Sequence, residues 1–456
     1  MTYQSINPYT GKLEKSFADL DAAELEKKLA LAHSCFKDDW SQRGFQARTA
    51  VLKRAANLMR ERAQMLAELI TKEMGKLIAQ SLGEVALSAA IVDYYADHAE
   101  QFLAPEILST TKGEAMVESS PIGVLFGVEP WNYPYYQVAR FAAPNLMAGN
   151  VVMVKHASSV PQCALAFEQL MLDAGAPAGA YTNLFATKDQ VVQVIADPRI
   201  RAVALTGSEA AGAIVAAQAG KQLKKTTLEL GGSDAFIVLE DADMDKAIKH
   251  AVSGRMGNSG QACTASKRFI VVEPLADAFL EKFQAALGQF VAGDPLDKAT
   301  TLAPLSSAQA LDNLLAQVNG AVGQGARIAM GGSRVEGMPG NFMQPTVLTD
   351  ISQDNPAYKE EFFGPVALFF RVADEEAAIA IANDSPFGLG GSVFTQDIER
   401  GKRVARKIDT GMVFINSGAV SSPELPFGGV KNSGYGRELS SAGIQEFVNK
   451  KLIRIN

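Results

Sequence analysis

The most constraining feature of this sequence is a regular alternation of strand-like and helix-like segments that begins at about residue 121. The strand-like segments are short runs of apolar and β-branched residues, and several end in glycine or serine where a helical pattern starts. Such an alternation predicts an α/β fold with parallel sheets covered by helices and with ligands at the carboxyl ends of the strands. The predicted strands lie at residues 121–128, 150–155, 201–207, 226–232 and 236–239.

The domain organisation follows from where this alternation pauses. The first hundred residues are predicted to be helical, whereas the later strands and helices break off at Gly231-Gly232 and start again at Phe236. A chain of 456 residues is long enough for two or three structural units. We therefore predict two α/β domains that meet near residue 232 without a flexible linker, and a cleft at their interface.

Composition excludes several classes of protein. The apolar fraction of 47% and the charged fraction of 20% are typical of a globular chain and not of a disordered or fibrous one. The net charge of −7 predicts no general attraction for nucleic acid or for an anionic membrane. No segment approaches the roughly 20 consecutive apolar residues of a membrane helix, and the N-terminus lacks the pattern of a secretory signal. A soluble protein is expected.

The cysteines and histidines indicate a reducing compartment and no metal site. The three cysteines, at positions 35, 163 and 263, are an odd number spread over a long chain, which is not a disulfide framework. The four histidines lie far apart and form no metal-ligand spacing with the cysteines. We expect a cytoplasmic protein that binds no metal.

Three segments could carry chemistry, although each also has a structural explanation. Cys263 lies in a small-residue turn whose backbone amides could lower the thiol pKa, but a buried structural cysteine is the commoner case. Glu229 lies between leucines at a strand end, where desolvation would raise its pKa toward that of a general base, and an ion-paired glutamate fits equally well. Asn132, between two prolines, could present its amide to an oxyanion, although a plain loop is more common.

The order of these motifs is more specific than any one of them. Thr206-Gly-Ser208 begins a turn suited to a phosphate, which by itself is a weak dinucleotide signal. Taken together, the motifs closely resemble the NAD(P)-dependent aldehyde dehydrogenases, including the 34 residues that separate Glu229 from Cys263. The shared motifs are Asn7-Pro-Tyr-Thr-Gly11, Pro130-Trp-Asn-Tyr-Pro134, Thr206-Gly-Ser208, Leu228-Glu-Leu-Gly-Gly232, Gly260-Gln-Ala-Cys263, Glu361-Phe-Phe-Gly-Pro-Val366 and Pro426-Phe-Gly-Gly-Val-Lys-Asn-Ser-Gly434.

This resemblance implies the domains and the assembly. It implies a Rossmann-type dinucleotide-binding domain, a catalytic domain and a small β element that bridges subunits in a homodimer or homotetramer. The final residues also have the pattern of an exposed strand that could pair with a neighbouring sheet edge. The implied ranges are 1–102 and 122–231 for the first domain, 232–440 for the second, and 103–121 and 441–456 for the bridging segments.

The resemblance also implies a mechanism. The Cys263 thiolate would attack an aldehyde, and the Asn132 side chain and the Cys263 N–H would hold the resulting oxyanion. Hydride transfer would leave a thioester, and Glu229 would activate the water that hydrolyses it to a carboxylic acid. Relatives that pass the acyl group to coenzyme A generally lack this glutamate, so hydrolysis is expected.

Cofactor contacts carry over from the family in the same way. NAD-preferring relatives often have a glutamate three residues after the lysine that is equivalent to Lys155, and its carboxylate repels a 2′-phosphate. Ser158 occupies that position here, so both NAD and NADP are expected to serve. The implied contacts are Ser208 with the pyrophosphate, Lys155 with the adenine ribose, Glu361 with the nicotinamide ribose, Phe363 near the nicotinamide, and backbone contacts from Trp131 and Leu230.

The substrate is indicated by Arg140, on the helix that should line the aldehyde tunnel. Succinate-semialdehyde dehydrogenases are similar in having arginine there and a serine equivalent to Ser421, and a guanidinium can grip a carboxylate through two charge-assisted hydrogen bonds. The alternative for Arg140 is a surface salt bridge. A second arginine that some of these enzymes place six residues before the cysteine is replaced by Gly257, and Arg255 lies nearby.

The whole chain is most similar to the short bacterial succinate-semialdehyde dehydrogenases, which makes succinate semialdehyde the expected substrate. Two alternatives keep the same chemistry: glutarate semialdehyde, or a broad range of aliphatic aldehydes. A third is a catalytically silent protein that retains the fold, against which the intact Cys263, Glu229 and Asn132 argue.

Overall fold

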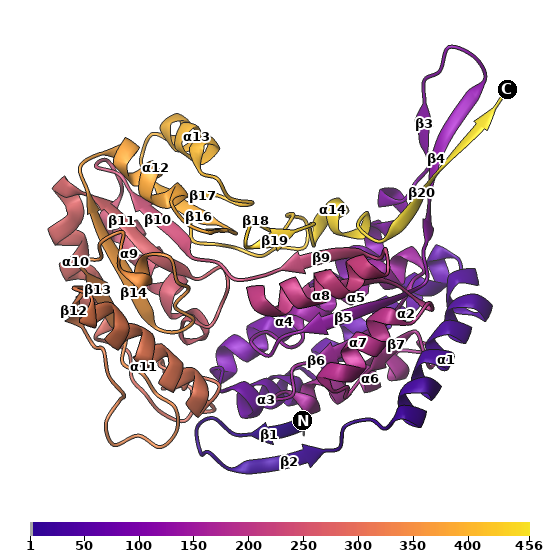
Figure 1. The fold of residues 1–456 in the computed structure, drawn as a ribbon, viewed down its shortest axis with the longest axis horizontal. Helices are drawn as coiled ribbons and strands as arrows, with labels where there is room; N and C mark the ends of the chain where they lie inside the picture. Colours follow the sequence, from indigo (N-terminus) through magenta and orange to yellow (C-terminus); the bar gives the residue numbers. More distant parts are fainter. Residues whose placement is uncertain (1–2) are drawn as a thin grey trace.

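The computed structural model describes residues 3–456 and shows two α/β domains side by side, with a narrow arm at one end (Figure 1). The first domain is built on a six-stranded sheet in the order β19-β9-β8-β5-β6-β7. Its strands are parallel except β19, which is antiparallel to β9. They are β5 (Val124–Glu129), β6 (Val151–His156), β7 (Tyr181–Asn183), β8 (Ile200–Thr206), β9 (Lys225–Glu229) and β19 (Gly434–Tyr435).

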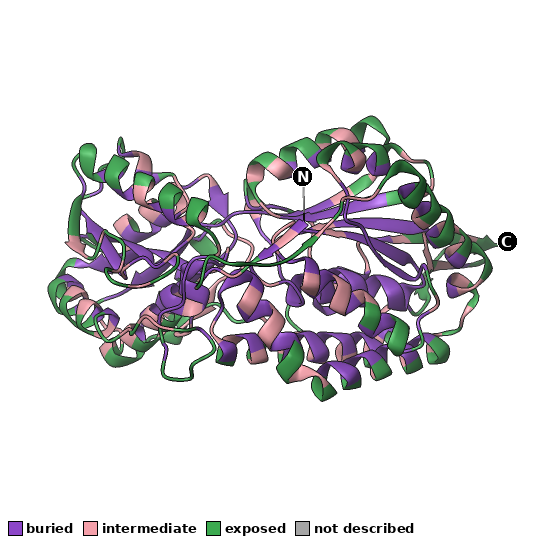
Figure 2. Ribbon diagram, turned by 90° about the horizontal axis from the view of Figure 1, so that it is seen from below, coloured by how far each residue is buried: buried purple, intermediate pink, exposed green. Residues whose placement is uncertain are grey.

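Helices cover both faces of this sheet, so its strands are buried while the outer helix faces are exposed (Figure 2). The first helix begins at a capping box, in which Asp21 and Glu24 each accept a hydrogen bond from the other's backbone N–H. The helices are α1 (Ala22–Asp38), α2 (Phe45–Glu61), α3 (Ala63–Met74), α4 (Ile78–Phe102), α5 (Tyr136–Ala148), α6 (Pro161–Asp173), α7 (Lys188–Ala196) and α8 (Glu209–Lys221).

The second domain repeats the same architecture on a seven-stranded sheet, in the order β12-β13-β14-β11-β10-β16-β17. All neighbours are parallel except β12 and β13, so the predicted parallel α/β fold is confirmed in both domains. Its elements are β10 (Asp234–Val238), α9 (Met244–Met256), β11 (Ser266–Val272), α10 (Glu273–Leu287), α11 (Ala308–Gly323), β12 (Arg327–Met330), β13 (Thr346–Thr349), β14 (Val366–Val372), α12 (Glu375–Asn383), β16 (Gly391–Phe394), α13 (Ile398–Lys407) and β17 (Phe414–Ile415).

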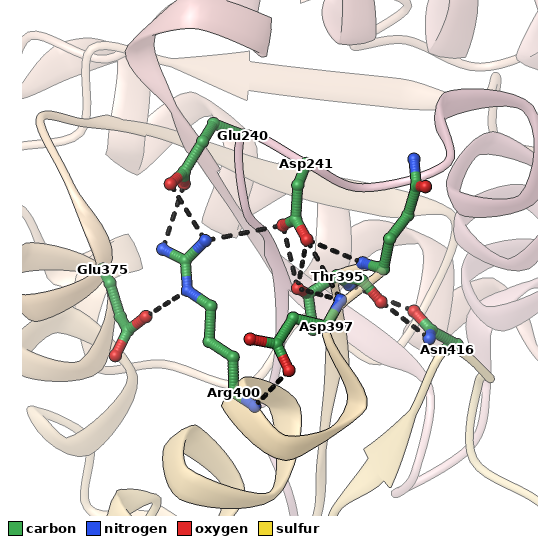
Figure 3. Close-up of polar contacts among 8 residues, drawn as sticks. Glu240, Asp241, Glu375, Thr395, Asp397, Arg400 and Asn416 are labelled. Carbon is green, nitrogen blue, oxygen red and sulfur yellow. Dashed lines mark hydrogen bonds and ion pairs between the residues drawn. The ribbon is translucent and has the colours of Figure 1, made fainter.

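A polar cluster ties together the loops that follow β10 and β16 (Figure 3). The Asp241 carboxylate accepts a hydrogen bond from the Thr395 hydroxyl over 2.8 Å, and the Arg400 guanidinium bridges Glu240 and Glu375 at 2.9 and 2.6 Å. These contacts fix the start of α13 against the sheet. Because none of these residues lines either cavity described below, we assign the cluster a structural role.

The chain crosses between the domains after β9 and returns near its end. The predicted division at residue 232 lies between the end of β9 and the start of β10. The return includes β19, which lies within the range expected for the second domain but pairs with β9 of the first sheet. Among residues 3–456, no helix is long and apolar enough to cross a membrane.

The arm is a three-stranded antiparallel sheet in the order β20-β4-β3 that projects from the first domain (Figure 1). It leaves apolar side chains of Ile107, Leu452 and Ile455 exposed. The arm and the remaining short elements are β3 (Glu106–Leu108), β4 (Glu114–Pro121), β20 (Val448–Ile455), β1 (Tyr3–Ile6), β2 (Leu13–Phe17), β15 (Phe387–Gly388), β18 (Val430–Lys431) and α14 (Ser440–Ile444).

Candidate active site

Two cavities meet at the Cys263 side chain, between the two domains. The first, of about 290 Å³, is lined by the ends of β8 and β9 and the loop after β5, and from the other domain by Glu361 and Phe363; we call it the sheet-edge cavity. The second, of about 370 Å³, lies among α4, α5 and loops that include Gly257 and Ser421; we call it the helical cavity. Since Cys263 lines both, its thiol is accessible to a different ligand from each side.

Cys263 lies on a tight turn that follows α9. Asn258, Ser259 and Gly260 have positive φ angles of 52°, 50° and 77°, an unusual run of three consecutive left-handed residues. At Gly260 a Cβ atom would lie 2.2 Å from a backbone carbonyl oxygen, so only glycine fits. The Cys263 thiol is half-buried, whereas the other two cysteines are fully buried, which leaves it the most accessible thiol of the described residues.

The electrostatic surroundings of this thiol differ from the prediction. Burial raises the pKa of the Cys263 thiol to about 11, and the positive charges of Lys267 and Arg140 offset only part of that rise. The prediction that the turn lowers the thiol pKa is therefore wrong, because desolvation outweighs the favourable charges. The thiol needs a nearby base to become the nucleophilic thiolate.

Asn132 lies in the sheet-edge cavity and is held in place from both ends of its side-chain amide. Its Nδ2 donates to the backbone oxygen of Gln261 over 3.0 Å, and its Oδ1 accepts from the Gln137 amide over 2.9 Å. Gln261 precedes Cys263 by two residues, so this bond ties Asn132 to residues 258–263, which we call the nucleophile turn. One of the two Nδ2 hydrogens is engaged in this way, and the other is available to a ligand.

Glu229, the last residue of β9, is buried and lines the same cavity. Neither of its carboxylate oxygens accepts a hydrogen bond from a described residue, and it belongs to none of their ion pairs. Burial and the nearby Glu438 raise the pKa of the Glu229 carboxyl well above its usual range, while Arg140 opposes that rise. An unpartnered carboxyl of raised pKa that lines the same cavity as a thiol has the properties of a general base.

Most residues predicted to contact the cofactor line the sheet-edge cavity. Ser208 caps the N-terminus of α8, where the first backbone N–H groups of the helix suit a phosphate. At Gly231 a Cβ atom would lie 2.5 Å from Glu361 Oε2, so the missing side chain leaves this carboxylate accessible. Such a cradle fits the nicotinamide end of a dinucleotide. The predicted cofactor residues in the cavity lining are Trp131, Ser208, Leu230, Glu361 and Phe363.

Lys155 and Ser158 lie apart from both cavities, at the carboxyl end of β6 and in the loop that follows it. Because β6 neighbours β5 in a parallel sheet, this loop lies along the same sheet edge as the cavity. Burial lowers the pKa of the Lys155 ammonium to about 8, and its Nζ donates to the backbone oxygen of His156 over 3.0 Å. Their position fits the far, adenosine end of a dinucleotide that extends along the edge.

Arg140 is buried and lines the helical cavity, which excludes the alternative of a surface salt bridge. Its Nε lies 2.6 Å from a carboxylate oxygen of Glu438, and its Nη1 donates to the Tyr136 hydroxyl over 3.3 Å. That hydroxyl in turn donates to Ser421 over 2.8 Å. Nη2 of Arg140 makes no hydrogen bond with a described residue, so one donor of the guanidinium remains for a ligand.

Arg255 does not join Arg140 in the helical cavity. It is fully buried behind the nucleophile turn, where its Nη2 donates to the backbone oxygen of Gly260 over 2.7 Å and its Nη1 to that of Val366 over 3.3 Å. Gly257, which replaces the second arginine of some relatives, lines the cavity. A carboxylate in this cavity would therefore meet Arg140 without help from Arg255.

The structure also reveals buried charged residues that the sequence analysis missed. Lys76 forms a buried ion pair with Glu84 and donates to the backbone oxygen of Asn132 over 2.8 Å, which anchors the loop after β5. Lys267 bonds the backbone of the nucleophile turn and the Glu361 carboxylate. Glu84 in α4 and Lys267 in β11 are charged residues within otherwise apolar patterns, which was the available signal, since such residues are buried only when paired; Lys76 lies in the loop between α3 and α4 and offered no such signal.

Comparisons with known proteins agree with this geometry. The model of the aldehyde dehydrogenase family matches residues 1–453. The succinate-semialdehyde dehydrogenase (NADP+) of Deinococcus radiodurans is 53% identical over 99% of this chain and 94% of its own. The probable succinate-semialdehyde dehydrogenase (NADP+) of Synechocystis is 46% identical over the full length of both chains. The crystal structure of succinic semialdehyde dehydrogenase from Streptococcus pyogenes in complex with NADP+ has a TM-score of 0.98, at 50% identity over 99% of each chain. The chain therefore belongs to the aldehyde dehydrogenase family.

Proposed function

We propose that this protein oxidises succinate semialdehyde to succinate, with NADP+ or NAD+ as the hydride acceptor and a thioester on Cys263 as the intermediate. The observation that carries the substrate is Arg140, a buried guanidinium in the lining of the cavity that ends at Cys263, whose Nη2 has no hydrogen-bond partner among the described residues. Charge-assisted hydrogen bonds from a guanidinium suit the carboxylate at the far end of this substrate. The names of the relatives from Deinococcus and Synechocystis support the same substrate.

The first step is attack of Cys263 on the aldehyde carbon. Glu229, whose raised pKa lies closer to that of the thiol than an ordinary glutamate's, accepts the thiol proton directly or through water. The tetrahedral oxyanion then binds the second amide hydrogen of Asn132 and the Cys263 N–H. The bonds that hold Asn132 to Gln137 and Gln261 keep this donor in position before the reaction begins.

The second half of the reaction releases the acid. A nicotinamide in the sheet-edge cavity supplies the hydride acceptor, after which Cys263 carries a thioester. Glu229, after passing the thiol proton to solvent, takes a proton from a water molecule, whose oxygen attacks the thioester carbon. The C–S bond then breaks, succinate is released, and the sulfur of Cys263 takes a proton back from Glu229. Burial keeps Glu229 away from competing hydrogen-bond donors, so its charged form remains basic.

The residues along the sheet edge support use of both cofactors. Ser208 and the N-terminus of α8 would hold the pyrophosphate, and Glu361 the nicotinamide ribose. Ser158 places a neutral hydroxyl near Lys155 at the adenosine end, where a glutamate would repel a 2′-phosphate. The NADP+ in the names of the relatives supports acceptance of the phosphate.

Initial rates of NADPH and NADH formation test the proposal, with succinate semialdehyde, glutarate semialdehyde and hexanal each over a concentration series. We expect kcat/KM for succinate semialdehyde to exceed that for hexanal by about tenfold or more, which corresponds to about 1.4 kcal/mol. A higher kcat/KM for hexanal would show that Arg140 does not bind the substrate. A higher kcat/KM for glutarate semialdehyde than for succinate semialdehyde would support the carboxylate site but show that the preferred substrate is one carbon longer.

The variant Arg140→Lys is expected to lower kcat/KM for succinate semialdehyde by about 10- to 100-fold, because an ammonium cannot replace the planar donors of the guanidinium. Lysine retains the positive charge beside Glu438, so the buried carboxylate stays compensated and the fold is preserved. Hexanal is the internal control, and its kcat/KM should change by less than roughly threefold. Equal losses for both aldehydes would contradict a carboxylate site at Arg140.

We further propose that the protein is a cytoplasmic homodimer or homotetramer assembled through its arm. The exposed Ile107, Leu452 and Ile455 on a projecting sheet support this, since isolated apolar strands favour burial against another chain. The three unpaired cysteines of the described residues suit a reducing compartment. Light scattering of the purified protein measures the assembly, and a monomer at micromolar concentration would contradict it.

A further inference from the structure

Lys267, on β11, is a fully buried cation near the nucleophile, and its contacts extend in two directions. Its side chain has no exposed area. The ammonium donates to the backbone oxygens of Ala262 and Cys263 over 2.8 and 2.7 Å and lies 2.9 Å from Oε1 of Glu361. Three acceptors satisfy the three N–H donors of a lysine. Burying an ammonium is unfavourable unless it is fully paired, and this one links the nucleophile turn to the carboxylate of the sheet-edge cavity.

The bond to Ala262 determines where the Cys263 N–H points. A trans peptide unit is planar, so its C=O and N–H lie on opposite sides of the chain, and the described residues contain no cis peptide bond. Because Lys267 holds the Ala262 oxygen from behind, the N–H of the same peptide unit faces away from Lys267. A cation on the carbonyl also polarises the unit and makes that N–H a stronger donor.

The bond to Glu361 gives its two carboxylate oxygens different surroundings. Oε1 receives both the Lys267 ammonium and the backbone N–H of Gly232, over 2.9 and 3.1 Å. Oε2 lies against the bare Cα of Gly231, on the wall of the sheet-edge cavity. Lys267 therefore anchors one oxygen and leaves the other toward a ligand.

We propose that Lys267 is a positioning residue that joins the two halves of the active site: it aligns the Cys263 N–H as an oxyanion donor and holds Glu361 in place for the cofactor ribose. Only the kinetic consequences of this role depend on the proposed aldehyde oxidation. Its effects on thiol reactivity and on NADP+ binding are measured without any aldehyde, so failure of one proposal does not imply failure of the other.

The first readout is the rate of alkylation of Cys263 by iodoacetamide from pH 7 to pH 12, a range that includes the thiol pKa of about 11, with the modified peptide identified by mass spectrometry. Lys267 is the leading group that lowers the pKa of this thiol. In Lys267→Met we expect the midpoint of the rate–pH curve to rise by one unit or more. The charged and titratable groups that act on or are coupled to the thiol are Lys267, Arg140, Glu361, Asp234 and Tyr133.

In Glu361→Gln we expect the alkylation midpoint of Cys263 to shift in the opposite direction, which makes this variant an independent test. The Glu361 carboxylate raises the thiol pKa, so its removal should lower the alkylation midpoint while Lys267 stays on the turn. Both Lys267→Met and Glu361→Gln should weaken NADP+ binding by tenfold or more in fluorescence titrations. Glu361→Gln keeps the test decisive even if Lys267→Met fails to fold: an alkylation midpoint that does not fall in this variant would overturn the electrostatic link.

Arg268→Met is the matched control, because Arg268 is a buried cation next to Lys267 on the same strand but makes different contacts. It bonds the backbone oxygens of Ser233, Ile381 and Ala382 and has no contact with the nucleophile turn. Its loss should lower Tm. The midpoint of the rate–pH curve should stay within half a pH unit of the wild type, and the Kd for NADP+ should stay within twofold. A folded Lys267→Met that behaves in the same way would show that Lys267 is only structural.

Lys267→Arg separates charge from alignment. A guanidinium keeps the positive charge, but its planar donors cannot meet three acceptors arranged around one ammonium. We expect an alkylation midpoint within half a pH unit of the wild type, together with a kcat reduced tenfold or more and a KM for the aldehyde changed by less than threefold. Full wild-type kcat in Lys267→Arg would contradict the alignment of the oxyanion donor.

Discussion

Cys263→Ala is expected to lower kcat for aldehyde oxidation by about 10⁴-fold or more, since loss of the nucleophile removes covalent catalysis altogether. The two cavities of the active site meet at this side chain, and no other cysteine of the described residues is exposed enough to replace it. Iodoacetamide labelling of the wild-type protein should abolish activity in step with modification of Cys263. The rate of NADPH formation measures both effects.

Cys35→Ala is the matched control for this variant. Cys35 is buried on α1, and burial raises the pKa of its thiol to about 11, as at Cys263. Its loss should reduce stability slightly and leave kcat within roughly twofold, because it is remote from both cavities. Activity that survives in Cys263→Ala would refute covalent catalysis at this residue. A folded wild-type protein that labels at Cys263 but oxidises no aldehyde would instead be catalytically silent.

Glu229→Gln is expected to slow turnover by about 10²- to 10³-fold, with the larger part of the loss in the hydrolysis of the thioester and a smaller part in the first step, where the thiol proton then passes to water. The amide is similar in shape to the protonated carboxyl but cannot take a proton from water. Rapid mixing with substrate and NADP+ should give a burst of close to one NADPH per active site, followed by slow turnover. Mass spectrometry of the quenched protein should find the succinyl group on Cys263.

The pH dependence of the wild-type protein follows from the same carboxyl. Burial raises the pKa of Glu229 by disfavouring its charged form, so less base is present at low pH and the hydrolysis rate should rise as pH increases through that raised pKa. Glu229→Gln should lose this rising limb. A burst-free variant with full turnover would show that another group activates the water.

Glu129→Gln is the control for removal of a buried carboxyl. Glu129 ends β5, and burial raises its pKa well above the usual range, but it lines neither cavity. Burial favours the neutral form of this carboxyl, and glutamine is close to that form in shape. We expect no burst and less than roughly threefold loss of kcat, so a burst in both variants would indicate a general disturbance of the interior.

Much of the fold follows from local patterns that the sequence contains directly. Strand-forming runs that end in glycine or serine before a helical period predicted the parallel sheets. Alternating strands and helices bury their apolar faces when the strands form a parallel sheet and the helices pack on it. The capping box of Asp21 and Glu24 fixed the start of α1 in the same local way. The short linear motifs around Asn132, Glu229 and Cys263 were likewise sufficient to indicate the family.

The electrostatics of the site depend on neighbours that are distant in the sequence. The thiol pKa of Cys263 is raised, not lowered, because desolvation is a property of everything packed around the turn. Arg140 is paired with Glu438, almost 300 residues later, and nothing near either residue in the sequence signals the pair. Arg255 and Lys267 are both close to Cys263 in sequence, and only the packing shows that they support the turn from behind.

The sequence by itself determined the fold class, the family and the residue types available for catalysis, since those depend on periodicity and on short motifs. Only the tertiary structure decided which charges face one another, which donors remain free and which carboxyl is unpartnered. Coulomb interactions and desolvation act through space, at distances of a few ångströms that the order of residues along the chain does not specify.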